Sequence, residues 1–307
     1  MRLATIQPPG GSVLVAAAAA AGDSWVELAA LTGRPPGPLE NQLVWLMDHA
    51  DSVQAQLGSW RGPRWPAAEV TFAPPVTQPP SFRDFYAFEQ HVKTARARRG
   101  LPVPPFWYEQ PVFYFSNPRA LVGHGAPVHA PVNSQELDYE LELGIVIGRP
   151  GRDIADADAW RHIAGLTVLN DCSARDLQRA EVTVGLGPAK AKDFATAVGP
   201  WLVTLDEFAD RISGETLTLG MSARRNGRTL SQGNVSALYH SIPRLIAQAS
   251  RDATLFPGDL IGTGTVGTGC LLELGAEENG GWLRPGDVVE LEIERIGVLR
   301  TPLVARP

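Results

Sequence analysis

The sequence predicts an α+β protein that is mainly β, with one large domain and one small one. From residue 137 onward, short runs rich in β-branched residues are separated by Gly and Pro, which is typical of short strands. Helical spacing is confined to a few stretches that do not alternate regularly with the strands, which argues against a doubly wound parallel sheet. A chain of 307 residues with 44% hydrophobic residues can bury a large core.

The predicted domain boundary lies at a proline-rich segment. Residues 73–80 read A-P-P-V-T-Q-P-P and follow a short strand predicted at 70–72. This composition is typical of a linker. Residues 1–75 are therefore predicted to form a small N-terminal domain of β and α structure, and residues 76–307 the larger domain.

The small domain is predicted to contain a β-hairpin or small meander followed by a helix. Within residues 3–31, strands at Val13–Ala19 and Trp25–Leu31 flank a turn at 21–23. After a proline-rich break, Leu39–Leu57 has the apolar spacing of a single helix.

The larger domain is predicted to begin with a helix over Ser81–Arg99. Ser81 stands at the N-cap position with Asp84 three residues later, a pattern similar to a capping box. On such a helix Asp84 and His91 share one face, about two turns apart. The alternatives are that Asp84 only caps the helix and that His91 is an exposed or core histidine.

The remaining elements are predicted to be short strands with occasional helices. Residues 111–118 read as a buried strand that carries Tyr114. Further strands are predicted at 201–204, 217–224, 260–263, 270–274 and 288–293, and helices at 155–162, 206–212 and 235–249.

Three acidic residues are the first candidates for a site. Glu140 and Glu142 alternate with apolar residues in L-D-Y-E-L-E-L-G-I-V-I-G, so they project to the same face of a strand. Asp171 follows a second β-rich run, 166–170. Neighbouring carboxylates on a covered face need a proton or a cation between them. Oxygen ligands without a His or Cys cluster suit Mg²⁺ first and Mn²⁺ or Ca²⁺ next. The alternative is a solvated strand edge.

Two loops carry further candidates. The run G-T-G-T-V-G-T-G at 262–269 lacks the Gly-Lys-Ser/Thr ending of a phosphate loop and is predicted to precede a strand, which argues against a nucleotide site. A tight turn that brings Thr265 close to a ligand fits it better. Lys192 lies in a loop bounded by Gly and Pro, where a lysine either faces solvent or holds an anion or oxyanion.

Glu273 interrupts the apolar run C-L-L-E-L, which is predicted to be a core strand. A buried carboxylate needs a partner, and none is near in sequence. A histidine from elsewhere in the chain would supply one.

Composition excludes several function classes. The net charge of −6 without a basic block argues against nucleic acid as a partner. Cys172 and Cys270 form no C-x-x-C pattern, which favours a reducing compartment, and no apolar run is long enough to span a membrane, so a cytoplasmic location is expected. No G-x-S-x-G context surrounds Ser134 or Ser173, which argues against a serine hydrolase.

Six motifs in series resemble the fumarylacetoacetate hydrolase family over about residues 76–307. They are F-R-D-F-Y-A-F-E-Q-H, L-D-Y-E-L-E-L, N-D-C-S-A-R-D-L-Q, G-P-A-K-A-K-D-F-A-T, G-T-G-T-V-G-T-G and L-L-E-L. The resemblance implies a mixed β-roll catalytic domain, a small N-terminal domain, a divalent ion and usually a homodimer.

The resemblance also implies roles for individual residues. The positions that match the family's metal ligands are Asp84, Glu140, Glu142 and Asp171. His91 and Glu273 match its water-activating dyad. The positions that match substrate contacts are Tyr86, Tyr114, Gln178, Lys192 and Thr265.

The implied activity is metal-dependent hydrolysis of a carbon–carbon bond in a β-diketo acid, such as an acylpyruvate or a fumarylacetoacetate-like compound. Val182 stands where the hydrolase of tyrosine breakdown has a substrate-contacting tyrosine, so the substrate is expected to differ. The alternatives are a decarboxylase, tautomerase or hydratase of a 2-oxo acid at the same metal site, or a metal-stabilised binding protein without catalysis.

Overall fold

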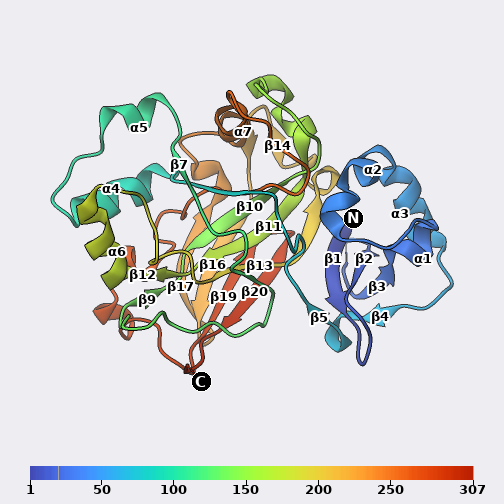
Figure 1. Cartoon of the computed structure of the whole chain (residues 1–307), viewed down its shortest axis with the longest axis horizontal. Coiled ribbons are helices and arrows are strands. Elements are labelled where there is room, and N and C mark those ends of the chain that lie inside the picture. The colour runs from blue at the N-terminus through green and yellow to red at the C-terminus, as the bar shows by residue number, and fades with distance from the viewer. Residues whose placement is uncertain (20, 307) are drawn as a thin grey trace.

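The computed structural model describes residues 1–19 and 21–306 (Figure 1). Ala20 and Pro307 fall within the two predicted domains and lie outside the described residues. The strands are β1 (Arg2–Gln7), β2 (Leu14–Ala18), β3 (Ser24–Glu27), β4 (Trp65–Pro66), β5 (Thr71–Phe72), β6 (Phe82–Phe85), β7 (Phe113–Phe115), β8 (Leu121–Val122), β9 (Leu137–Asp138), β10 (Leu141–Ile147), β11 (Ile163–Asp171), β12 (Ser173–Ala174), β13 (Thr196–Thr204), β14 (Ile212–Ser213), β15 (Thr216–Leu217), β16 (Gly220–Arg225), β17 (Arg228–Asn234), β18 (Leu260–Gly262), β19 (Val288–Ile293) and β20 (Gly297–Pro302).

The helices are short, as expected for a fold that is mainly β. The α-helices are α1 (Leu28–Thr32), α2 (Leu43–Asp48), α3 (Ala50–Ser59), α4 (Glu89–Ala97), α5 (Pro105–Glu109), α6 (Arg175–Glu181), α7 (Ile242–Ser250) and α8 (Leu271–Leu274). The 3₁₀ helices are Leu39–Asn41, Ala67–Glu69, Asp156–His162, Val182–Val184, Leu205–Phe208, Val235–Ala237 and Glu277–Asn279.

A large mixed sheet is the frame of the molecule. Within the described residues it has twelve strands, ten of them in the order β4-β3-β2-β1-β13-β11-β10-β18-β6-β7, and a separate sheet has the order β17-β16-β19-β20. The two central strands β10 and β11 pair antiparallel and are buried along their whole length. Strands covered on both faces read as nearly continuous apolar runs, so the acidic residues on them stand out.

The N-terminal strands continue the same sheet. β1 pairs antiparallel with β13, with Arg2 opposite Val203 and Leu3 opposite Leu202. Figure 1 shows these first strands in blue at one end of the molecule, covered by α1, α2 and α3. One apolar cluster joins Leu3 and Val26 to Val146 and other residues of the larger part. The predicted boundary near residue 75 stays a prediction.

The predicted meander is confirmed over β1, β2 and β3, but its last strand was predicted too long. The strand ends at Glu27, and Leu28–Thr32 is helical. Leu and Ala are strong helix formers. Gly33 ends this helix with a φ of 69°, and its N–H donates to the carbonyl of Ala29, as at many helix C-termini.

The single helix predicted over Leu39–Leu57 is wrong: a 3₁₀ turn and the helices α2 and α3 take its place. The break is at His49, whose φ is −125°. Its Nδ1 forms a hydrogen bond with the carbonyl of Trp45 at 2.9 Å, the group that its own N–H would bond in an unbroken helix. The N–H of His49 donates to Leu46 instead.

The helix predicted over Ser81–Arg99 is also wrong in its first half. Phe82–Phe85 is the buried strand β6, parallel to β18 and antiparallel to β7, and the helix α4 begins at Glu89. The hydroxyl of Ser81 donates to Asp259 Oδ1 at 2.6 Å and caps no helix. Asp84 and His91 therefore do not share a helical face. Sheet pairing with a distant strand has overridden the local helix signal.

The strand predicted at 270–274 is wrong as well, because residues 271–274 form the short helix α8. The carboxylate of Asp138 accepts the N–H groups of Leu271 and Leu272 at 2.8 and 3.0 Å. A carboxylate at this position satisfies donors that have no partner within the helix. The glycine-rich run 262–269 consequently precedes a helix, which corrects one of the two reasons given against a nucleotide site; the missing Gly-Lys-Ser/Thr ending still applies.

Smaller differences concern lengths. The strand predicted at 111–118 is only Phe113–Phe115 and is half-buried, with Phe115 65% exposed. The strand predicted at 217–224 divides into β15 and β16, and the helices predicted at 206–212 and 235–249 are the 3₁₀ turn Leu205–Phe208 and a 3₁₀ turn followed by α7. In the part of the chain that the structure describes, no helix combines the length and apolar character that crossing a membrane requires.

Candidate functional site

A cavity of about 440 Å³ lies where α4 and α6 approach the strands β6, β7 and β10. Nine of the eleven predicted site residues line it: Asp84, Tyr86, His91, Tyr114, Glu140, Glu142, Gln178, Lys192 and Thr265. The other two, Asp171 and Glu273, are buried and bond to side chains that line it. The size is in the range of small-molecule pockets.

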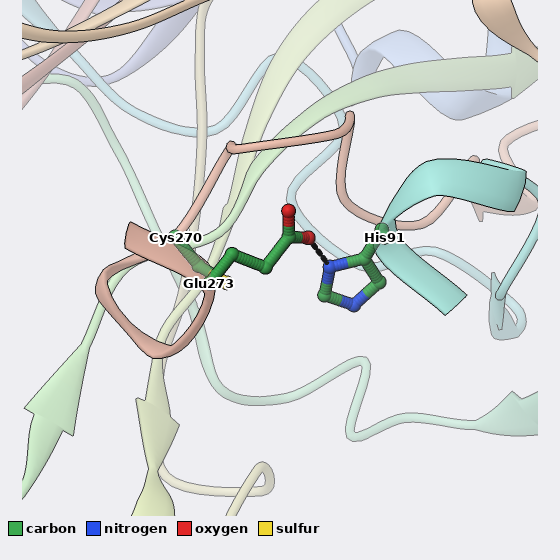
Figure 2. A group of neighbouring side chains, drawn as sticks. All are labelled: His91, Cys270 and Glu273. Carbon is green, nitrogen blue, oxygen red and sulfur yellow. Dashed lines mark hydrogen bonds and ion pairs between the residues drawn. The ribbon is translucent and has the colours of Figure 1, made fainter. Parts of the chain in front are cut away.

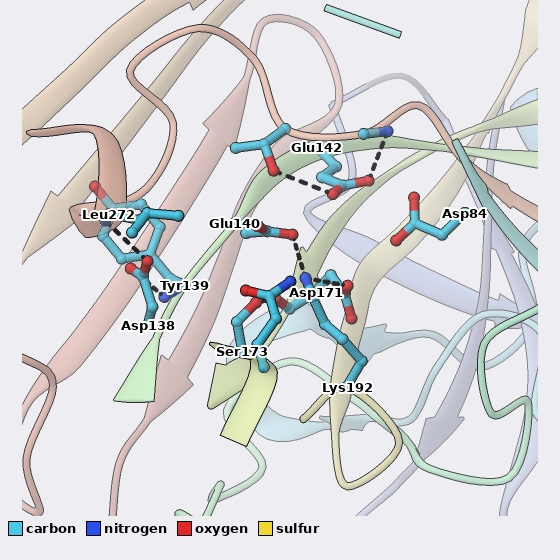
Figure 3. Close-up of polar contacts among 12 residues, drawn as sticks. Asp84, Asp138, Tyr139, Glu140, Glu142, Asp171, Ser173, Lys192 and Leu272 are labelled. Carbon is cyan, nitrogen blue, oxygen red and sulfur yellow. Dashed lines mark hydrogen bonds and ion pairs between the residues drawn. The ribbon is translucent and has the colours of Figure 1, made fainter. Parts of the chain in front are cut away.

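Three carboxylates meet at one side of the cavity, and we call Asp84, Glu142 and Asp171 the acidic cluster. They come from β6, β10 and β11, and one oxygen of each lies within 4.8 Å of the others (Figure 3). Gly262 of β18 makes room for them, because a Cβ at this residue would lie 2.4 Å from Asp84 Oδ1 and 2.9 Å from Glu142 Oε2. Only glycine permits this approach.

The electrostatics of the acidic cluster suit a hard divalent cation. Burial raises the pKa of Asp84 well above its usual range, and the charge of Asp171 raises it further. Burial and the charge of Asp84 do the same to the pKa of Glu142. Asp84 Oδ1 is buried without a hydrogen-bond partner. Carboxylate oxygens that repel one another and include an unpartnered buried atom fit Mg²⁺, Mn²⁺ or Ca²⁺.

Glu140 is not part of the acidic cluster and is bonded by two cations. Arg175 Nη2 donates to its Oε1 at 2.7 Å, and Lys192 Nζ contacts its Oε2. Burial alone would raise the pKa of Glu140, but the charges of Lys192 and Arg175 outweigh burial and lower it. The structure thus groups three of the four predicted metal ligands, and the ligand role of Glu140 stays a prediction.

Lys192 is buried and links the two groups of acids. Its Nζ donates to Asp171 Oδ2 at 2.6 Å in addition to contacting Glu140 (Figure 3). Burial acts against the charged ammonium, but the charges of Asp171 and Glu140 raise its pKa. The hydroxyl of Tyr114 donates to the same Asp171 oxygen at 2.6 Å. An ammonium has three N–H donors, so Lys192 retains one for a ligand.

His91 and Glu273 meet across two helices, α4 and α8. His91 Nδ1 contacts Glu273 Oε1, and the backbone N–H of Thr268 donates to Glu273 Oε2 at 2.5 Å (Figure 2). A carboxylate can only accept, so Nδ1 carries the hydrogen and Nε2 keeps its lone pair. The prediction that a distant histidine partners Glu273 is confirmed, although Glu273 lies on a helix and not on a strand. The catalytic role of the pair stays a prediction.

The predicted substrate contacts lie around the same space. The Tyr86 ring packs edge-on against His91, with 5.3 Å between ring centroids. The side-chain oxygen of Gln178 accepts from Arg175 Nη1 at 3.0 Å, and the hydroxyl of Thr265 lies 3.5 Å from Glu142 Oε1. Val182 lines the cavity, so the position that lacks the family's tyrosine does face this space. The substrate-binding roles of these residues stay predictions.

The sequence reasoning missed a buried link between the acidic residues of the site and the helix that carries Glu273. Arg175 Nε donates to Asp138 Oδ2 at 2.8 Å while its Nη2 holds Glu140, and Asp138 in turn accepts the first N–H groups of α8. One guanidinium thereby connects a residue beside the acidic cluster to the start of the helix that carries Glu273. The signal was present, because residues 138, 140 and 142 share one face of an extended chain.

Comparison with known proteins identifies the family. Residues 81–304 match the family described as Fumarylacetoacetate (FAA) hydrolase C-terminal. The mitochondrial oxaloacetate tautomerase FAHD2A of Homo sapiens is 35% identical over 244 residues, which cover 79% of this chain and 72% of that protein. The 2,4-didehydro-3-deoxy-L-rhamnonate hydrolase of Sphingomonas sp. (strain SKA58) is 35% identical over 201 residues, 65% of this chain and 66% of that protein.

Among solved structures, maleylpyruvate hydrolase from Sphingobium sp. SYK-6, in complex with manganese(II) and pyruvate, is similar over 100% of both chains, with a TM-score of 0.73 and 27% identity. These relatives are enzymes that act on small molecules, two of them named hydrolases and one a tautomerase. The matched segment spans most of the chain and contains every predicted site residue. This chain belongs to the fumarylacetoacetate hydrolase family.

Proposed function

We propose that the protein hydrolyses a carbon–carbon bond in a β-diketo acid, such as an acylpyruvate or a fumarylacetoacetate-like compound. The observation that carries the proposal is the contact of His91 Nδ1 with Glu273 at the wall of the cavity. This contact leaves Nε2 free to accept a proton from water, a step that hydrolysis requires and that enol–keto exchange does not.

We propose that Asp84, Glu142 and Asp171 hold a divalent cation, with Glu140 as a fourth ligand. Mg²⁺ is the first candidate, and Mn²⁺ or Ca²⁺ are alternatives. When bound, such an ion supplies Lewis-acid polarisation of substrate oxygens. The manganese in the related maleylpyruvate hydrolase structure supports a metal in this family.

The residues of this chain have distinct parts in the proposed reaction. His91 Nε2 takes a proton from water while Glu273 holds Nδ1–H and stabilises the imidazolium that forms. The hydroxide attacks the carbonyl carbon next to the bond to be broken. As that bond breaks, its electron pair passes to the neighbouring carbonyl oxygen and forms an enolate. His91 then returns its proton to the enolate carbon, which gives two acids or an acid and a ketone.

Lys192 is the proposed stabiliser of the enolate. It already donates to Asp171 and contacts Glu140, which hold its ammonium beside the acidic cluster. The remaining N–H can donate to the oxygen on which negative charge develops. Donors that are already in position at a buried site act strongly because they need no reorganisation.

An alternative is the exchange of enol and keto forms of a 2-oxo acid, or its decarboxylation or hydration, at the same metal site. The specific observation in its favour is the 35% identity to a protein named oxaloacetate tautomerase. In this alternative the acidic cluster and Lys192 would suffice, and the pair His91–Glu273 would not take part in proton abstraction from water.

A substrate panel separates the two. The purified protein is incubated with acylpyruvates and with oxaloacetate, each with Mg²⁺, Mn²⁺ or Ca²⁺, in water enriched in ¹⁸O. Hydrolysis predicts release of two carboxylic acids, or an acid and a ketone, with the label in the new carboxyl group. Faster enol–keto exchange of oxaloacetate, or CO₂ release, without labelled acid from any substrate would contradict hydrolysis and favour the alternative.

The homodimer and the cytoplasmic location expected from the sequence belong to the same proposal. Light scattering on the purified protein tests the first, and localisation in cells tests the second.

A further inference from the structure

A second set of metal-ligating side chains lies beside the acidic cluster and differs from it in chemistry. His91, Cys270 and Glu273 are all buried, and one donor atom of each lies within 4.8 Å of the others (Figure 2). We call these three residues the mixed-donor cluster. It offers one nitrogen, one sulfur and one oxygen, whereas the acidic cluster offers oxygen alone.

Donor type decides which cations each cluster prefers. Oxygen donors select hard ions such as Mg²⁺, while thiolate and imidazole select Zn²⁺ and similar softer ions. We propose that the mixed-donor cluster is a binding site for a thiophilic divalent cation, Zn²⁺ or Cd²⁺, separate from the hard-metal site of the acidic cluster. A site with three protein ligands and one open position is the arrangement common to many zinc enzymes.

The donors would have to rearrange around a cation. Zinc bonds of roughly 2.0–2.3 Å place tetrahedral ligands about 3.3–3.8 Å apart. His91 Nδ1 and Glu273 Oε1 are in direct contact and must separate to admit the cation, whereas a donor separation near 4.8 Å must shorten by about 1 Å. Cys270 immediately precedes the four-residue helix α8 that carries Glu273, and His91 projects from another helix.

The surroundings supply the rest of a metal site. Of the three ligands, His91 lines the cavity, and a water molecule would take the fourth position from that side. The N–H of Thr268 donates to Glu273 Oε2 at 2.5 Å, and Oε1, which contacts His91 Nδ1 in the metal-free pair, would turn to the cation. Hydrogen bonds of this kind, made to a ligand from behind, orient it and strengthen binding.

Cation binding would change the state of His91. In the metal-free pair Nδ1 carries the hydrogen and Nε2 has the lone pair. A cation at Nδ1 needs the lone pair there, so the hydrogen moves to Nε2, and the thiol of Cys270 releases its proton to solvent as it becomes a ligand. A histidine with its hydrogen on Nε2 cannot accept a proton from water. The cation would therefore inhibit hydrolysis, a consequence that rests on the proposed function.

Cd²⁺ titration of the Mg²⁺-saturated full chain tests the site without relying on turnover. Cadmium bound to a thiolate gives an ultraviolet charge-transfer band. We expect this band at one Cd²⁺ per chain in the wild type and in Cys172→Ser, which removes the other thiol. We expect its loss in Cys270→Ser and Cys270→Ala, with Cd²⁺ affinity lowered at least about 100-fold, because loss of outer contacts alone costs about 10–100-fold.

Absence of the band in the wild type, or its persistence in both Cys270 variants, would overturn the proposal, as would its loss in Cys172→Ser. Thermal unfolding of each variant without Cd²⁺ shows whether it is folded, and two different replacements at Cys270 guard against a packing artefact. Inhibition is measured separately, as each variant's activity with Cd²⁺ relative to its own activity without. If the band behaves as expected while Cd²⁺ leaves wild-type turnover intact, the metal site stands and the general-base role of His91 fails.

Discussion

The side chains of the acidic cluster come from strands, whereas those of the mixed-donor cluster come from helices or the residue next to one. The carboxylates of the acidic cluster come from β6, β10 and β11, all of which are buried. In the large sheet β10 and β11 are neighbours, and β18 lies between β10 and β6. The mixed-donor cluster draws its side chains from or next to two short helices, α4 and α8. Hydrogen bonds to neighbouring strands hold β10 and β11 on both sides, whereas α8 has only four residues. We therefore call the acidic cluster the rigid half of the site and the mixed-donor cluster the adjustable half.

The largest expected effect comes from breaking the adjustable half. His91→Ala should lower turnover on the best substrate by about 10²–10⁴-fold, the range typical for loss of a general base. Glu273→Gln keeps an acceptor for Nδ1–H but removes its charge, so it should fall between His91→Ala and the wild type. Steady-state kinetics of the three proteins measure the order. Near-normal turnover of His91→Ala would show that the reaction does not use this base.

The next effect comes from removing the link between the halves. Arg175→Met should lower the free energy of unfolding by about 3–5 kcal/mol, because it leaves the buried carboxylate of Asp138 without its cation and Glu140 with Lys192 alone. The matched control on the same helix is Arg179→Met, whose guanidinium pairs with Glu136 at the surface and is 56% exposed. Denaturant unfolding of both variants tests this. Equal losses of unfolding free energy in the two variants would mean that the burial of the Arg175 ion pairs adds nothing to stability.

A smaller effect should distinguish the rigid half. Mg²⁺ or Mn²⁺ at about one hundred times its dissociation constant should stabilise the protein by about 2.7 kcal/mol, because the ion binds only the folded state. Glu142→Gln should lose most of this gain. Without metal the same variant should be no less stable than the wild type, since it removes one of three repelling carboxylates. Thermal unfolding of the wild type and of Glu142→Gln, each measured with metal and after a chelator has removed it, gives the four stabilities to compare. An equal gain in Glu142→Gln would remove that residue from the metal site.

The smallest effect is expected at the surface of the helix that carries His91. Lys93 pairs with Glu89 one turn away, but its side chain is 57% exposed. Exposed pairs of this kind contribute little because water and salt screen them. Lys93→Ala should change neither the thermal midpoint nor turnover measurably. A clear loss of turnover would show that the position of α4 is more sensitive than its buried contacts suggest.

The sequence predicts β10 and β11 better than β6 and α8 for a physical reason. β10 and β11 are buried throughout, so their apolar character and the acids that interrupt it are visible locally. Asp84 was placed on a helix because the strand that pairs with β6 lies far along the chain, and the sequence does not show this partner. The same holds for α8, whose N–H groups are satisfied by Asp138, 133 residues away from Leu271.

The predicted site residues nevertheless lie together around one cavity, although some were assigned to the wrong elements. The order of six motifs does not depend on whether Asp84 lies on a helix or a strand. What neither motif order nor spacing could supply is the contact between Arg175 and Asp138, or the distance of Cys270 from His91. The first depends on how α6 lies against β9, and the second on how α8 lies against α4.

The pairing of β1 with β13 has a consequence for work with shorter fragments. A polypeptide limited to the family-matched residues 81–304 would lack β1, so the edge of β13 would present unpaired N–H and C=O groups to solvent. The apolar side chains of Val198 and Leu202, which are buried in the whole chain, would be exposed to solvent at the same edge. Such an edge is a template for association with another chain. We expect β1 to prevent such association by pairing with β13, and a fragment without β1 to aggregate.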